Sequence, residues 1–88
     1  MKIVRKYELE PTSGQKSFYR KAYVKVYEDG SEVLRSYDTD VLKRESDGTY
    51  IRLWDDWSAT TGRHIKAFSG MNKKEYEAVE YRDLGEDD

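Results

Sequence analysis

The stretch from Thr49 to Met71 constrains the fold more than any other part of the chain, because it runs from a strand pattern through a turn into a helix pattern. Residues 50–54 alternate aliphatic side chains with aromatic and basic ones, a period of two that places successive side chains on opposite faces of a strand. From about Thr60 the apolar side chains recur every three or four residues, as on one face of a helix, and Gly70 stands where a left-handed cap would end it. A helix of about three turns is marginal alone in water, so the sequence predicts that it packs on the sheet.

This packing sets an expectation for the two faces of the sheet. Ile65 and Phe68 lie on the apolar side of the predicted helix, and Ile51 and Leu53 are the aliphatic members of the strand before it. We expect these four side chains to share one core, and the aliphatic residues of an earlier strand to join them there: Ala22 and Val24. The opposite face of the sheet would then carry the aromatic and basic side chains and would be free for contact.

Short turns are expected to join the other strands into an antiparallel meander. Asp29-Gly30 lies between two alternating runs, which favours a hairpin turn of type I′, and turn residues recur at 38–40 and 46–48. The first strand, whose place in the sheet the sequence leaves open, is expected to turn its Ile3 side inward. The predicted strands lie at 2–9, 17–27, 32–37, 41–44 and 49–54.

A second, shorter helix is expected near the end of the chain. Asn72 and Glu75 have the spacing of a capping box, and Gly85 would stop the helix. The sequence therefore predicts an α+β fold: an antiparallel β-meander of four to five strands packed against one α-helix, with a short C-terminal helix.

Length and composition narrow the class of protein. Eighty-eight residues make a single domain over 1–88, in which the acidic residues 85–88 are expected to be a flexible tail. The absence of cysteine rules out disulfides and thiolate metal sites and is compatible with a reducing compartment. No apolar run has the length of a membrane span, and the N-terminus lacks the pattern of a signal peptide. We therefore expect a cytoplasmic protein with no membrane partner.

Catalytic chemistry has few candidate residues in this chain. His64 is the single histidine, so the chain offers neither a nucleophile triad nor a histidine metal cluster. At the edge of the predicted apolar helix face, a packed and hydrogen-bonded histidine is the expected role, with a proton carrier as the alternative. Asp55 and Asp56 are adjacent at a strand end and point to opposite sides, so turn formation is the simpler interpretation. We expect no enzyme, no cofactor and no metal site.

The start of the predicted helix offers a candidate anion site. Exposed amides, hydroxyls and an arginine near a helix N-terminus can hold a phosphate or a carboxylate. The glycine and lysine spacing of a Walker loop is absent, and ordinary helix capping explains the hydroxyls equally well. The candidate residues are Ser58, Thr60, Thr61, Arg63 and His64.

A set of aromatic and basic residues is expected to form a contact face on the sheet. Rings interleaved with cations suit single-stranded nucleic acid, in which bases stack on rings and phosphates meet cations. Tyr, Trp and Arg are also favoured anchors of protein interfaces, and they make good cross-strand pairs within a fold. The net charge of −2 does not favour nucleic acid. The candidate binding residues are Tyr23, Lys25, Tyr27, Tyr50, Arg52, Trp54 and Trp57.

Several short motifs resemble a known family. They are Ser17-Phe18-Tyr19 with Lys21-Ala22, Ser36-Tyr37-Asp38-Thr39, and the run from Ser58 to Ile65 with Phe68 after it. Over roughly residues 5–70 the chain is similar to small, uncharacterised proteins carried by phages and prophages of Gram-positive bacteria, and the block Thr-Thr-Gly-Arg-His-Ile is its most specific part. That family has no settled activity, so the resemblance implies a mobile-element origin and, with it, a host bacterial cytoplasm.

Two functional hypotheses of different classes follow. The first is a non-enzymatic, phage-encoded accessory protein that binds a host or phage protein through the aromatic face or the Ser58 to His64 turn. It would act as an inhibitor of host defence, like an anti-CRISPR protein, or of a nuclease, and the acidic segments 28–47 and 75–88 would mimic DNA. The second is a small nucleic-acid-binding regulator that uses Lys25, Arg52 and Arg63. The sequence leaves the oligomeric state open.

Overall fold

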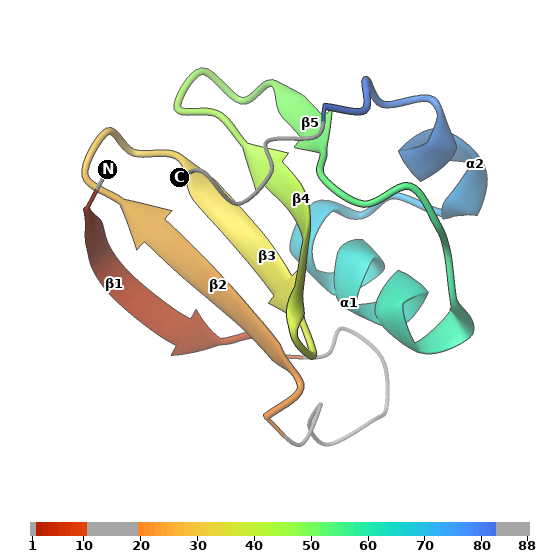
Figure 1. The fold of residues 1–88 in the computed structure, drawn as a ribbon, viewed down its shortest axis with the longest axis horizontal. Coiled ribbons are helices and arrows are strands. Elements are labelled where there is room, and N and C mark those ends of the chain that lie inside the picture. Colours follow the sequence, from red (N-terminus) through yellow and green to blue (C-terminus); the bar gives the residue numbers. More distant parts are fainter. Residues whose placement is uncertain (1, 11–19, 83–88) are drawn as a thin grey trace.

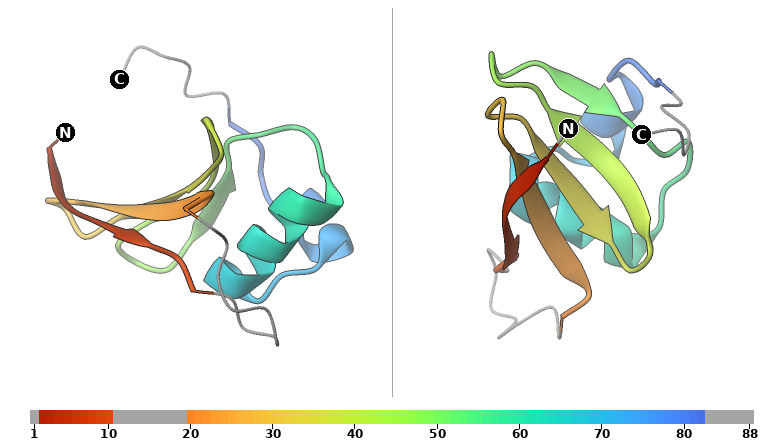
Figure 2. Two further views of the ribbon diagram at one scale, coloured as in Figure 1. Left: turned by 90° about the horizontal axis from the view of Figure 1, so that it is seen from below. Right: turned by 60° about the vertical axis from the view of Figure 1, so that its left-hand side comes forward.

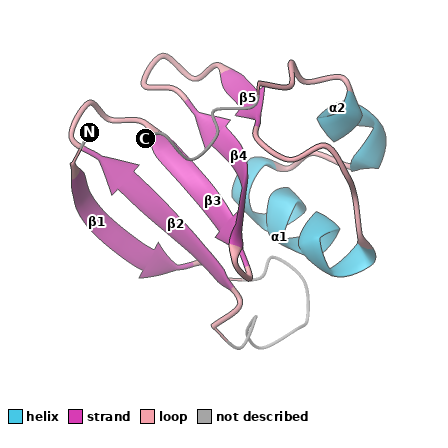
Figure 3. Ribbon diagram, in the orientation of Figure 1, coloured by secondary structure: helices cyan, strands magenta, loops and turns pink. Residues whose placement is uncertain are grey.

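The computed structural model describes residues 2–10 and 20–82 and confirms the α+β meander. Antiparallel strands lie side by side in chain order, so β1 is an edge strand next to β2 (Figure 1). The strands are β1 (Ile3–Glu8), β2 (Ala22–Tyr27), β3 (Glu32–Ser36), β4 (Thr39–Arg44) and β5 (Tyr50–Arg52). They are followed by the helices α1 (Ala59–Ser69) and α2 (Lys73–Glu77), which lie on the same side of the sheet (Figures 2 and 3).

Helix α1 begins and ends as its sequence predicts. The Ser58 hydroxyl accepts a hydrogen bond from the Thr61 amide at 3.1 Å, which satisfies a donor of the first turn. Gly70 has a φ of 83° and donates its amide to the Lys66 carbonyl, so the left-handed cap is present. Ile65 and Phe68 are buried in one cluster with Ala22 and Val24, and this half of the packing prediction is confirmed. Other buried members of the cluster are Leu9, Leu34, Val41, Leu42 and Tyr76.

The orientation predicted for β5 is wrong. Arg52 is the register partner of Leu42, a core residue, so Tyr50 and Arg52 lie on the helix side of the sheet. The Tyr50 ring meets Phe68 edge to face, with ring centroids 6.5 Å apart. Ile51 is paired with Lys43 on the opposite face, and Leu53 lies outside the core cluster. Tyrosine and arginine can bury the apolar part of the side chain at the edge of a core while the polar end stays near solvent, and this explains why Tyr50 and Arg52 face the helices.

A bulge in β4 sets the faces of the last two strands. Leu34 pairs with Leu42 but the next residue, Arg35, pairs with Asp40, which leaves Val41 without a cross-strand partner. Val41 and Leu42 are both buried, although they are adjacent in the chain. The turn residues at 38–40 predict a strand that begins only at Val41, whereas β4 begins at Thr39. An extra residue of this kind is not visible in a simple alternating pattern.

The β2–β3 hairpin also differs from its prediction. The Gly30 amide donates to the Tyr27 carbonyl, the Tyr27 amide donates to the Ser31 carbonyl, and of the central pair only Gly30 has positive φ. This is a three-residue connection with a left-handed glycine, not a type I′ turn. The Asp29 carboxylate accepts from both the amide and the hydroxyl of Ser31, which holds Asp29 outside the left-handed region.

Strand β1 turns only its second half toward the core. The register slips between Ile3 and Arg5, and Ile3 is 45% exposed where the alternation predicted an inward side chain. Leu9 is buried, and Tyr7 packs against the core cluster. The first residues of β1 therefore leave apolar surface exposed at the edge of the sheet.

Helix α2 confirms the capping box and closes the other edge. The Asn72 side chain accepts from the Glu75 amide, and the Glu75 carboxylate accepts from the Asn72 amide. The helix ends at Glu77, well before Gly85, which with the predicted tail 85–88 lies outside the described residues. Residues 80–82 then bind the outer edge of β5 through two backbone hydrogen bonds to Arg52. In the described part of the chain, neither helix has the length and apolar character needed to cross a bilayer.

Candidate functional site

The predicted aromatic and basic contact face does not exist as one surface. Tyr23, Lys25 and Tyr27 alternate with the buried residues of β2 and lie on the open face, which we define as the face of the sheet opposite the helices. The other predicted members belong to the helix side, since Tyr50 and Arg52 share the face of the core, and both tryptophans pack against it: Trp54 and Trp57. The predicted set is divided because the aromatic and basic side chains of β2 face away from the helices, whereas those of β5 face toward them.

The open face carries an apolar and aromatic area at the β1 edge. Ile3 is the register partner of Tyr27, and the exposed Val4 follows it at the bulge. The Lys6 ammonium lies 4.9 Å from the centroid of the Tyr23 ring. We call these five residues the β1–β2 patch: Ile3, Val4, Lys6, Tyr23 and Tyr27. The alternation of β1 predicts an inward Ile3, so Ile3 was not among the candidate binding residues, and Val4 was not among them either.

Three other cations of the open face, Lys25, Arg35 and Lys43, are already paired with carboxylates. The Lys25 ammonium lies 2.9 Å from one oxygen of Asp40, and the Arg35 guanidinium lies 3.6 Å from the other. Lys43 pairs with Glu45 at 3.7 Å. A phosphate backbone would therefore have to compete with these carboxylates for the same cations.

The five residues of the candidate anion site do not converge on one point. The Ser58 hydroxyl is occupied as the helix cap, and the Thr61 hydroxyl is buried against Ser36 at 2.9 Å. His64 is buried as well, whereas Arg63 is exposed on the other side of the helix turn, with Thr60 half-buried. The geometry thus matches helix capping and not an anion site.

His64 belongs to a buried polar cluster that ties α1 to β3. Its Nδ1 lies 2.8 Å from the Ser36 hydroxyl, and the two side chains are 1% and 2% exposed. Burial, with a smaller contribution from the charge of Arg63, lowers the pKa of His64 below its usual value. The Ser36 and His64 pair has no access to an external substrate, so its geometry fits the packed role predicted for His64. Ser36 was missed, although it follows Leu34 on the inward face of β3.

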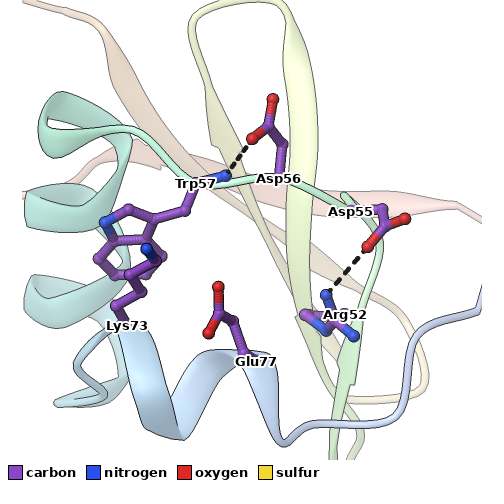
Figure 4. Close-up of a pocket in the computed structure, with 6 residues that line it drawn as sticks. All are labelled: Arg52, Asp55, Asp56, Trp57, Lys73 and Glu77. Carbon is purple, nitrogen blue, oxygen red and sulfur yellow. Dashed lines mark hydrogen bonds and ion pairs between the residues drawn. The ribbon is translucent and has the colours of Figure 1, made fainter.

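A cavity of about 220 Å³ opens between β5, the segment after it, and α2 (Figure 4). Its lining residues are Arg52, Asp55, Asp56, Trp57, Lys73 and Glu77. The contribution of α2 to the cavity was not predicted. Its only signal in the sequence is the spacing of Lys73 and Glu77, which lie four residues apart on one helix face.

Arg52 is the structural support of this cavity. Its Nε donates to the Val79 carbonyl at 3.0 Å, and its Nη1 lies 3.4 Å from the Asp55 carboxylate. The guanidinium carbon lies 5.6 Å from the ring centroids of both Tyr76 and Tyr81, and the side chain is only 14% exposed. Arg52 therefore binds the segment after α2 to the edge of the sheet.

The geometry holds no candidate metal centre within residues 2–10 and 20–82, where no three histidine or acidic side chains are grouped to hold an ion.

A family model described as a family of unknown function, DUF8033, matches residues 7–86. The chain belongs to this family. Membership in DUF8033 agrees with the uncharacterised family expected from the sequence motifs. No curated protein and no solved structure matches the DUF8033 chain.

Proposed function

We propose that this protein is a non-enzymatic, phage-encoded accessory protein that binds a host or phage protein through the β1–β2 patch. The observation that carries the proposal is the exposed apolar and aromatic surface on the open face, where Ile3 and Val4 are 45% and 59% exposed beside Tyr27. Exposed aliphatic side chains next to tyrosines have the composition of a protein contact surface. The phage origin rests on the sequence motifs alone.

A protein partner fits this surface better than a nucleic acid does. Lys25 and Arg35 are engaged by Asp40, and Lys6 covers the ring of Tyr23, on which a base would otherwise stack. Aliphatic side chains such as Ile3 add apolar area, which contributes to protein interfaces but does not read bases. A nucleic-acid-binding regulator is the alternative function.

Inhibition by contact through this patch is better supported than DNA mimicry. Several carboxylates of the acidic segment 28–47 are neutralised within the fold, since Glu32 pairs with Arg44, and Asp40 and Glu45 pair with lysines. DNA mimicry requires an array of unpaired negative charge. We therefore place the inhibitory contact on the patch.

Site-specific photocrosslinking tests the proposal. A benzophenone amino acid replaces Tyr27 in the patch or, as the matched control, Tyr37, an exposed tyrosine in the β3–β4 turn. Irradiation in the bacterium that carries the gene should give a discrete adduct from position 27, which the additional change Ile3→Asp removes, and no such adduct from position 37. Identical adduct patterns from both positions, or none from position 27, would refute the proposed surface.

A titration separates the two hypotheses. Fluorescently labelled single-stranded and duplex DNA and RNA are titrated with the protein at low and at moderate salt. We expect no saturable binding in either condition. Binding that weakens steeply with added salt would favour the nucleic-acid regulator instead.

A further inference from the structure

The cavity beside α2 has one rigid aromatic wall. The Trp57 indole lies against the backbone of α1 at Gly62, where a Cβ atom would stand only 2.3 Å from a ring carbon. The Tyr76 ring packs on it from α2, with centroids 5.6 Å apart and an interplanar angle of 51°. These contacts hold the indole in place, and its remaining surface lines the cavity (Figure 4). A ring that is held in this way needs no ordering when a ligand arrives.

The charges around this wall leave an excess of negative charge. Arg52 and Asp55 pair with each other, and Arg52 is held further by the Val79 carbonyl. On the rest of the lining, the carboxylates of Asp56 and Glu77 stand against the ammonium of Lys73, and one oxygen of Asp56 accepts a hydrogen bond from the Trp57 amide at 2.7 Å. The Glu77 carboxylate projects into the space between the Trp57 ring and the Arg52 guanidinium (Figure 4). The cavity is therefore suited to a cation more than to an anion.

We propose that this cavity binds the guanidinium group of an arginine side chain presented by a peptide or protein. A planar guanidinium stacks on an indole and donates two parallel hydrogen bonds to a carboxylate, which are the two features that Trp57 and Glu77 supply. A volume of about 220 Å³, open to solvent, admits a side chain. A bare metal ion is a poor occupant, because the described acidic residues form no group able to hold one.

This inference does not rest on the proposed function. The β1–β2 patch lies at the β1 edge of the sheet, whereas the cavity lies at the β5 edge. Lys73 provides a second test, because its ammonium group lines the same cavity as Trp57 and would repel or compete with a bound cation. Replacing Lys73 by glutamine should tighten arginine binding, and a merely structural role for these side chains predicts no such gain.

The test is an NMR titration of the whole chain with N-acetyl-arginine amide and with its neutral isostere, N-acetyl-citrulline amide, at low ionic strength. We expect the Trp57 indole N–H signal to shift saturably with the arginine compound, which should bind about fivefold more tightly than the citrulline compound. Glu77→Gln should weaken arginine binding by about the same factor. Glu45→Gln, at a distant turn, is the matched control and should leave the affinity for the arginine compound unchanged.

Several outcomes overturn the proposal. Equal affinities for the two compounds, an unchanged affinity in Glu77→Gln, or shifts that map away from Trp57 each refute a guanidinium site. A response of the same signals to acetate but not to the arginine compound would assign the cavity to anions. Glu77 is exposed, so thermal unfolding of Glu77→Gln should match that of the unmodified chain, and a loss of binding then reports on the site itself.

Discussion

Gly62 should reverse the usual effect of replacing a helical glycine by alanine. Within a helix this change normally stabilises a protein by about 0.5 to 1 kcal/mol, because glycine loses more backbone freedom on folding. In α1 the added methyl group would stand 2.3 Å from one carbon of the Trp57 ring and 2.8 Å from another. Overpacking of this kind costs about 1 to 3 kcal/mol, so Gly62→Ala is expected to destabilise the fold.

A double-mutant cycle isolates the contact. In a Trp57→Ala background the ring is gone and Gly62→Ala should recover its ordinary stabilising effect, so the change in unfolding free energy should alter sign. The two backgrounds should differ by the overpacking cost alone, about 1 to 3 kcal/mol, because the backbone term is common to both. Urea unfolding followed by far-ultraviolet circular dichroism measures all four proteins without relying on tryptophan fluorescence. The same sign in both backgrounds would refute the close contact between α1 and the indole.

Three further predictions concern the core. Tyr76→Phe removes the single O–H group that the carbonyls of Val41 and Trp54 share, at 2.8 and 2.9 Å, and should cost about 1 to 3 kcal/mol in urea unfolding. A loss well below this would contradict the buried hydrogen bonding. Phe68→Ala removes a buried ring and should cost about 3 to 5 kcal/mol, measured in the same way. Because burial lowers the pKa of His64 below 6.5, the unfolded chain binds a proton that the folded chain resists. Stability should therefore fall as pH drops below about 6.5, and the fall between pH 7 and 5.5 should flatten in His64→Gln.

The elements that local chemistry determines could be predicted from the sequence. The caps at Ser58 and Gly70 and the capping box at Asn72 involve groups within a few residues of each other, and each has its expected partner. The order of β2 to β5 follows from short turns in the same way, whereas the sequence leaves the place of β1 open. The predicted type I′ turn at Asp29-Gly30 is wrong because the Asp29 carboxylate accepts hydrogen bonds from the amide and the hydroxyl of Ser31. The Asp-Gly pair alone gives no sign of this interaction with Ser31.

The candidate contact surface could not be predicted, because it depends on relations between distant strands. An alternating pattern shows which side chains of one strand share a face, but not which face meets the helices. For β5 the alternation predicts that Ile51 faces the helices, because it is aliphatic, whereas in the structure Tyr50 and Arg52 face them. The bulge at Val41 adds one residue to the pairing of β3 and β4, and it is not visible in the composition of either strand.

The residues that suggested a binding face explain how so polar a chain closes its core. Hydrophobic residues make up only 36% of the sequence, so aliphatic side chains alone supply little area. Tyr50 packs on Phe68, and Arg52 spreads its guanidinium on Tyr76 while it binds the segment after α2. A side chain used in this way is unavailable to a partner. Both proposals therefore use surface that the core leaves accessible, the β1–β2 patch and the side of the Trp57 ring that lines the cavity.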